Sequence, residues 1–176
     1  MFVTEPIGDD DPGSGFSCGE PALDTFFARH ALPNDRRGLG RTFVLRRPAD
    51  RLESLPAVLG FYTISMADLE AARVPEGLRA GLPRYPVPVA LIGRLAVETR
   101  TQGLRVGERL LADALARVVL ASQQIACMGV IVDAKNERAV GFYLKYGFAL
   151  LEPESAFPRR MFLPMATILE SLDDGP

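Results

Sequence analysis

One stretch of the sequence, from Val87 to Ala134, constrains the fold more than any other. Residues 87–97 are apolar almost throughout, which is typical of a strand buried on both faces. Residues 104–122 gather their apolar side chains on one side, as an amphipathic helix does, and residues 127–134 form a second apolar run. A strand, a crossover helix and a second strand normally make a parallel pair. The sequence therefore predicts a sheet with a parallel pair and a helix packed against it.

The flanking segments predict further strands and helices. Those rich in β-branched and aromatic residues read as strands, and those with helical periodicity or a capping residue read as helices. We expect strands at 41–47, 57–65, 148–151 and 159–164, a hairpin loop at 51–56, an extended segment at 83–88, and helices at 24–31, 67–80 (interrupted by Pro75), 136–147 and 168–172. The fold class is thus α/β, of the mixed α+β type, in a single domain over residues 1–176.

Composition excludes several classes of protein. No apolar run approaches the ~20 residues that span a bilayer, and the N-terminus lacks the pattern of a signal peptide, so we expect a cytoplasmic protein without membrane contact. Two cysteines and one histidine, without ligand spacing, argue against a metal site. The net charge of −2 argues against nucleic-acid binding by the molecule as a whole. A local arginine cluster is either a solvated surface or a patch for an anionic partner, with Arg36, Arg37 and Arg41 as its candidates.

The turn that opens the 104–122 helix is a candidate anion site. The first N–H groups of a helix lack intrahelical partners, and the helix dipole is positive there, so this turn can bind phosphate through its backbone. Gly103 and Gly107 permit close approach, but the pattern matches neither a Walker loop nor a dinucleotide fingerprint. Arg105 stands in the middle of the turn, and we expect a helical φ for it.

The helix predicted after Asn136 holds a candidate proton donor. Asn136 can cap the helix, Gly147 can end it, and Asn136, Ala139 and Tyr143 share one face. Tyr143 is either an amphipathic core residue or an acid that gives its proton to a leaving group of similar pKa. Both interpretations stay open at this point.

Together the two elements are more specific than either alone. Gln102-x-x-Arg105-x-Gly107, followed by Asn136-x-x-Ala139-x-x-x-Tyr143, resembles the Gcn5-related N-acetyltransferase (GNAT) superfamily. The resemblance implies a mixed central sheet of about six to seven strands with splayed parallel central strands and flanking helices. It also implies acetyl-CoA as cofactor and Tyr143 as the acid that protonates the leaving thiolate. The cofactor-binding residues that it implies are Leu95, Ala96, Val97, Gln102, Gly103, Leu104, Arg105, Val106, Gly107, Glu108, Asn136, Ala139 and Phe142.

Further segments, among them residues 60–65, 82–90 and 93–98, resemble the GNAT branch that contains acetyltransferase toxins of toxin–antitoxin pairs. That resemblance implies an N-acetyltransferase whose acceptor is the amino group of aminoacyl-tRNA, an antitoxin partner and a homodimer. Glu98 is the candidate general base, with water as the alternative. Two other hypotheses stay open: acetylation of a small amine or a protein, and a non-catalytic acyl-CoA-binding module.

Overall fold

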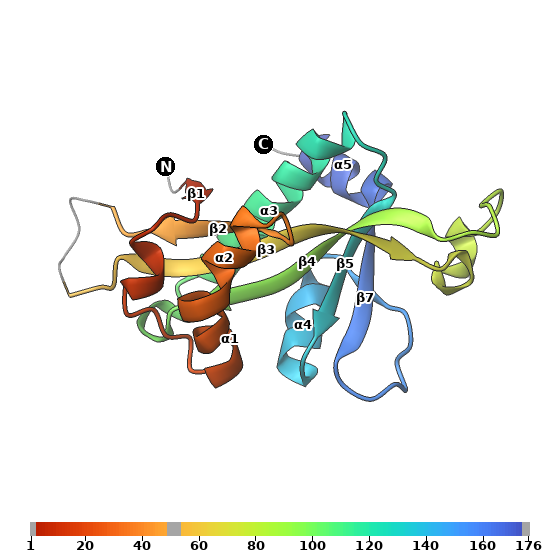
Figure 1. Ribbon diagram of the computed structural model, residues 1–176. Helices are drawn as coiled ribbons and strands as arrows, with labels where there is room; N and C mark the ends of the chain where they lie inside the picture. Colours follow the sequence, from red (N-terminus) through yellow and green to blue (C-terminus); the bar gives the residue numbers. More distant parts are fainter. Residues whose placement is uncertain (1–2, 49–53, 174–176) are drawn as a thin grey trace. The chain divides into compact units, whose positions relative to one another are not determined.

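A seven-stranded mixed sheet organises the computed structural model, which describes residues 3–48 and 54–173 (Figure 1). The strand order across the sheet is β1-β2-β3-β4-β5-β7-β6. The strands are β1 (Thr4–Pro6), β2 (Arg41–Arg46), β3 (Val58–Leu69), β4 (Val87–Val97), β5 (Gly129–Ala134), β6 (Ala149–Leu150) and β7 (Arg159–Pro164). The helices that position candidate residues are α1 (Pro21–Phe26), α2 (Leu32–Arg36), α3 (Val106–Ser122), α4 (Glu137–Lys145) and α5 (Met165–Asp173).

The predicted parallel pair is present. Helix α3 connects β4 to β5, and these two strands are neighbours in the sheet. The amide of Met128 donates to the carbonyl of Pro88 over 2.8 Å, so the beginnings of the two strands meet. The pairs β1–β2, β2–β3, β5–β7 and β6–β7 are antiparallel. The α/β class and the parallel pair predicted from residues 87–134 are thus confirmed.

Contacts divide the chain into two compact units, which are described separately. The first unit comprises residues 1–65 and 92–116, and the second comprises residues 66–91 and 117–176. Strands β3 and β4 contribute residues to both. One domain over residues 1–176 stays a prediction.

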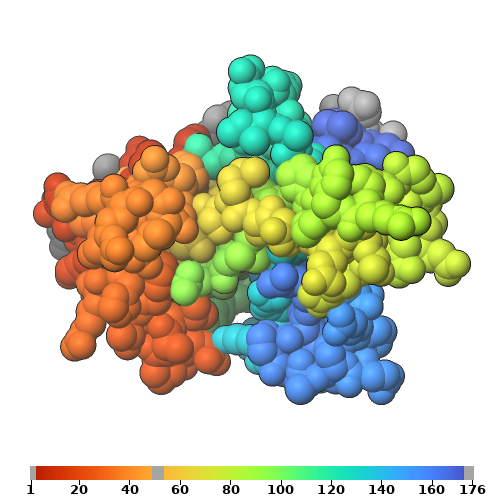
Figure 2. Space-filling view, turned by 45° about the vertical axis from the view of Figure 1, so that its right-hand side comes forward, coloured from red at the N-terminus to blue at the C-terminus, as the bar shows by residue number. Residues whose placement is uncertain are grey.

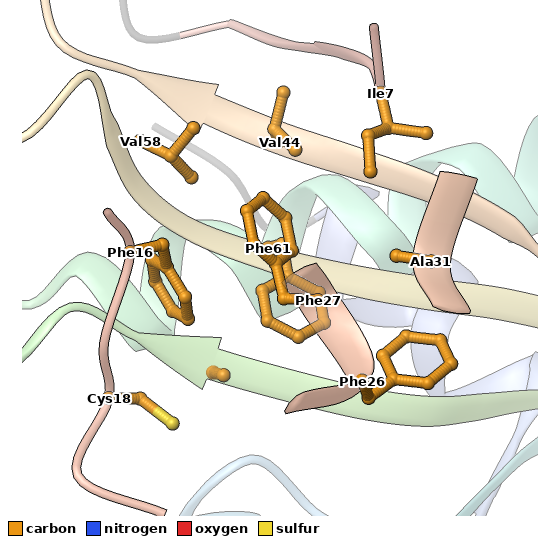
Figure 3. Close-up of a cluster of buried hydrophobic side chains, with 10 residues drawn as sticks. Ile7, Phe16, Cys18, Phe26, Phe27, Ala31, Val44, Val58 and Phe61 are labelled. Atoms are coloured by element: carbon orange, nitrogen blue, oxygen red, sulfur yellow. The ribbon is translucent and has the colours of Figure 1, made fainter. Parts of the chain in front are cut away.

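An aromatic cluster forms the core of the first unit (Figure 3). Phe61 of β3 is fully buried, and its ring centroid lies 4.7 Å from that of Phe27 and 5.3 Å from that of Phe16. Ala96 of β4 belongs to the same cluster. Gly60 lies beside it because no side chain fits there: a Cβ would lie 2.7 Å from Leu110 Cδ1 and 2.8 Å from the carbonyl oxygen of Ala96. This close approach brings the β3–β4 pair against α3.

The N-terminal helical segment is longer than the predicted 24–31. Helix α1 continues into a turn of π-helix, η2 (Phe27–Ala31), and then into α2. Pro33 has no N–H to donate and its ring clashes with the carbonyl four residues earlier, so a widened turn before it relieves that clash. In the space-filling view these segments form one continuous exposed surface, coloured red to orange (Figure 2).

The second unit packs a separate apolar cluster. Leu69, Val89, Ile131 and Phe162 are buried in it, and they come from β3, β4, β5 and β7. Helices α4 and α5 contact β5 in this unit. No helix in the described part of the chain is both long and apolar enough to cross a membrane.

The prediction for residues 67–80 is wrong. Strand β3 runs on to Leu69, and the rest forms two short 3₁₀ turns, η3 (Ala71–Arg73) and η4 (Glu76–Leu78), instead of a helix. Pro75 prevents a continuous helix, and Leu69, which is 1% exposed, is better buried as the end of a strand. The predicted hairpin loop at 51–56 lies partly outside the described residues.

Candidate functional site

The turn between β4 and α3, which belongs to the first unit, is tightly fixed by hydrogen bonds. A 3₁₀ turn, η5 (Thr99–Thr101), follows β4, and α3 begins at Val106. Gln102 Nε2 donates to the carbonyls of Val97 (3.2 Å) and Cys18 (3.0 Å). The amide and hydroxyl of Thr99 both donate to the carbonyl of Ser17, over 2.9 and 2.8 Å. Residues 17 and 18 therefore clamp the turn from the N-terminal side, a contact that the sequence did not predict.

The turn itself has the backbone of an anion cradle. Gly103 has a φ of 81°, and a Cβ built on it would meet nothing within 4 Å, so the backbone is open there. The first N–H groups of α3, which begin at Val106 and Gly107, have no acceptor within the helix. With the positive end of the helix dipole, these amides suit a phosphate or a pyrophosphate.

The predicted helical φ at Arg105 is wrong. Its φ is 62°, and it is the one non-glycine residue with positive φ among residues 3–48 and 54–173. The chain reverses just before α3, and this reversal requires a left-handed residue, at a cost of about 1–2 kcal/mol. The Arg105 guanidinium binds the Glu108 carboxylate, with Nη2 2.7 Å and Nε 2.8 Å from Oε2. This ion pair neutralises an acidic group in the first turn of α3, which keeps the turn favourable for an anion.

Glu98, the candidate base, is buried and binds Arg100 in the turn after β4. Its side chain is 4% exposed, and Oε2 accepts from the amide of Arg100 over 2.7 Å. Oε1 pairs with Nε of the same arginine at 3.1 Å. Both carboxylate oxygens thus bind Arg100, and Oε2 also caps η5.

In the second unit, α4 places the tyrosine as predicted. Asn136 caps the helix, since its Oδ1 accepts from the amide of Ala139 over 2.9 Å. The amides of Gly147 and Phe148 donate to the carbonyls of Leu144 and Tyr143, which ends the helix at the predicted place.

Tyr143 is buried among aromatic rings. It is 9% exposed, and its ring centroid lies 5.2 Å from that of Phe142 and 5.3 Å from that of Phe148. Its hydroxyl makes no hydrogen bond to the part of the chain that the structure describes. Burial raises the pKa of Tyr143 to about 12. The expectation that its pKa matches that of a thiol is therefore wrong, because desolvation disfavours the phenolate; the phenol stays protonated at neutral pH.

This raised pKa makes the stability of the protein depend on alkaline pH. Between pH 10 and pH 12 the phenol ionises in the unfolded chain but not in the folded one, so stability is complete below pH 10 and is lost as pH rises toward 12. We expect Tyr143 to account for about 1 kcal/mol of the loss at pH 11. Urea unfolding of the wild type and Tyr143→Phe at pH 8 and pH 11 measures this loss. An identical loss in both proteins would contradict it.

The predicted arginine patch is largely compensated by acidic side chains. Arg36 pairs with Asp9, and Arg41 Nη1 lies 3.1 Å from Asp35 Oδ1. Arg46, in the same stretch of sequence, pairs with Glu5 and Asp11. Arg37 is exposed and has no ion pair within the described residues. The sequence showed the basic residues but not that acidic partners from β1, η1 and α2 lie beside them.

Comparison with known proteins decides the family. The family description "Acetyltransferase (GNAT) domain" matches residues 84–169, which include both the turn and α4. The tRNA-acetylating toxin of Mycobacterium tuberculosis is 36% identical over 144 residues, which are 82% of each chain. The chain belongs to the GNAT acetyltransferases. It is therefore an N-acetyltransferase, as predicted from Gln102–Gly107 and Asn136–Tyr143.

Further relatives and solved structures are similar to this protein over almost the whole chain. A probable toxin TacT of Sinorhizobium fredii is 31% identical over 178 residues, covering 94% of this chain and 92% of its own. The structure of AtaT complexed with acetyl-methionyl-tRNAfMet is 31% identical, with a TM-score of 0.83, and covers 98% of this chain and 99% of its own. A tyrosine-to-phenylalanine variant of AtaT, bound to acetyl-CoA and to the C-terminus of the antitoxin AtaR, is 30% identical with a TM-score of 0.78 and covers 99% of each chain.

Proposed function

We propose that this GNAT enzyme transfers the acetyl group of acetyl-CoA to the amino group of aminoacyl-tRNA. One observation carries the choice of acceptor: the mycobacterial relative, which matches 82% of this chain, is a tRNA-acetylating toxin. The complex of AtaT with acetyl-methionyl-tRNA, the product expected of such a reaction, supports the same acceptor. The proposal places the enzyme in the cytoplasm, where charged tRNA is found.

The turn before α3 fits the anionic end of acetyl-CoA. We assign the pyrophosphate to the backbone of residues 102–108, because a Cβ on Gly103 would meet nothing within 4 Å and the first amides of α3 lack acceptors within the helix. Leu104 is 65% exposed and Arg105 pairs with Glu108, so neither side chain fills that space. Gln102 supports the turn through the carbonyls of Cys18 and Val97.

Tyr143 is the proposed hydrogen donor to the leaving sulfur. A thiol has a pKa near ~8.5, so a phenol with a pKa of about 12 does not surrender its proton fully before the bond breaks. It donates a hydrogen bond to the sulfur, which strengthens as negative charge develops there and so favours the transition state. Because the pKa is high, the Tyr143 hydroxyl stays protonated around neutral pH and can donate throughout that range.

Backbone and helix residues complete the assignment. The strand segment Leu95–Val97 offers its backbone to the pantetheine chain, and the N–H groups of Ala96 and Val97 are assigned to the carbonyl oxygen of the acetyl group. On α4, Asn136, Ala139 and Phe142 are assigned to the pantetheine chain. The attacking amine is neutral and gives its surplus proton to water, because the Glu98 carboxylate is occupied by Arg100.

The proposal extends to partners. Arg37, together with the exposed Arg36 and Arg41, is assigned to the tRNA backbone, although two of the three have acidic neighbours. By analogy with the AtaT complex with AtaR, we propose an antitoxin partner, and we propose a homodimer.

Incubation of the protein with acetyl-CoA and a mixture of charged tRNAs, polyamines and peptides tests the acceptor. Mass spectrometry is expected to find N-acetyl-aminoacyl-tRNA as the main product, and Arg36→Ala with Arg37→Ala is expected to lower its yield about threefold at low salt. Acetylated polyamine or peptide in place of charged tRNA would overturn the acceptor. Binding of acetyl-CoA without any acetylated product would indicate a non-catalytic module.

A further inference from the structure

Arg94 holds an unusual position on β4. It is an exposed arginine near the middle of an apolar strand. Its Cζ lies 3.7 Å from the centroid of the Phe26 ring of α1, a close cation–π contact. Phe26 is 8% exposed and stacks on Phe61, with the ring centroids 6.2 Å apart (Figure 3). A rigid aromatic surface therefore holds the guanidinium in place.

The stacked guanidinium keeps its donors available. Stacking uses the flat face of the group, whereas its N–H donors lie in the plane and point away from the ring. Within the described part of the chain Arg94 has no ion pair and no hydrogen bond. Arg36, Arg41 and Arg46, in contrast, all have carboxylate partners. Partial burial lowers the pKa of Arg94, but a guanidinium remains charged in proteins, so the site is a fixed and uncompensated cation.

The place of Arg94 along β4 points to the acceptor side of the reaction. Arg94 and Ala96 are two residues apart, so they lie on the same face of the strand with their Cα atoms about 7 Å apart. Both contact the cluster that contains Phe26. The proposed acetyl carbonyl lies at Ala96 and Val97, and the proposed pyrophosphate turn follows Val97 in the chain. Arg94 comes before both of these sites in the chain, at the end of the segment away from the pyrophosphate turn. An anion bound by Arg94 therefore belongs to the acceptor, the molecule that carries the amine.

We propose that Arg94 binds a phosphate of the acceptor, next to the aminoacylated end of the RNA. This inference rests on the proposed function. In aminoacyl-tRNA the α-carboxylate is esterified, so the anions available near the reacting amine are backbone phosphates. A planar guanidinium can hold a phosphate through two parallel N–H···O bonds. Arg94 thus selects an amine attached to a phosphodiester over a free amine.

Steady-state rates with two acceptors test this role. One acceptor is charged tRNA, and the other is the same amino acid esterified to adenosine, which carries no phosphate. For Arg94→Met, kcat/KM with charged tRNA is expected to fall about 10-fold more than kcat/KM with the adenosine ester. Arg94→Lys keeps the charge but not the paired donors, so its preference for charged tRNA over the adenosine ester is expected to lie between that of the wild type and that of Arg94→Met. Acetyl-CoA affinity and the thermal midpoint of each variant report on folding.

Three outcomes would overturn the role of Arg94. An equal fall with both acceptors would make Arg94 a structural residue that supports β4 and Phe26. No fall with either acceptor would remove it from recognition. With the free amino acid as a third acceptor, a fall in kcat/KM for that acceptor alone would identify a carboxylate as the ligand of Arg94. Failure of the proposed function is separate, because wild-type enzyme would then acetylate neither charged tRNA nor the adenosine ester.

Discussion

Tyr143→Phe is expected to lower kcat for acetyl transfer by about 100- to 1000-fold, within the range that a positioned proton donor contributes. The substitution removes only the hydroxyl and keeps the ring, which packs against Phe142 and Phe148. The affinity for acetyl-CoA is therefore expected to stay within twofold. Single-turnover transfer rates and calorimetric binding of acetyl-CoA separate the two effects.

Tyr146→Phe is the matched control for this prediction. Tyr146 lies three residues further along, and its ring centroid is also 5.2 Å from that of Phe142. The Tyr146→Phe substitution is expected to change kcat by less than about threefold, because no role in the chemistry is assigned to the Tyr146 hydroxyl. If both variants keep the wild-type rate, Tyr143 is a core residue and the departing thiolate leaves unassisted. If both lose the rate equally, packing of the helix end explains the effect.

The sequence predicted the elements whose patterns are local and strong. Strand β4 lies at Val87–Val97, as predicted, because eleven residues with few charges leave little choice of structure. Strand β7 at Arg159–Pro164 also has its predicted bounds. Asn136 caps α4 because its side chain needs only the amide of Ala139, three residues away. Interactions within a few residues can be inferred from the order of the residues alone.

The sequence could not predict what depends on distant partners. Arg36 and Arg46 belong to a basic run in the sequence, but Asp9 and Asp11, which lie 27 and 35 residues away, pair with them in the folded chain. Nothing in the sequence indicated a role for Arg94, because its contact with the Phe26 ring forms only when α1 folds against β4. Arg105 has a positive φ because of the geometry of the turn, and an arginine in the sequence does not indicate a positive φ. In each case the deciding contact joins segments that are separate in the chain, or depends on backbone geometry.

Gly103→Val is expected to weaken acetyl-CoA binding by about 30-fold or more, which corresponds to about 2 kcal/mol. Two effects combine: valine is strained at the φ of 81° that this turn has, and its side chain enters the open space at Gly103 to which the pyrophosphate is assigned. Isothermal titration with acetyl-CoA measures the affinity, and urea unfolding measures the strain.

Gly81→Val isolates the strain from the loss of the cradle. Gly81 has a φ of 78°, and a Cβ on it also meets nothing within 4 Å, but it lies between η4 and β4, in a segment to which no site residue is assigned. Both variants are expected to lose about 1–2 kcal/mol of unfolding free energy, because each forces a branched side chain into left-handed backbone. Only Gly103→Val is expected to lose affinity for acetyl-CoA. Equal affinity in the two variants would place the pyrophosphate elsewhere, since amides that must approach a phosphate closely cannot tolerate a side chain directly over them.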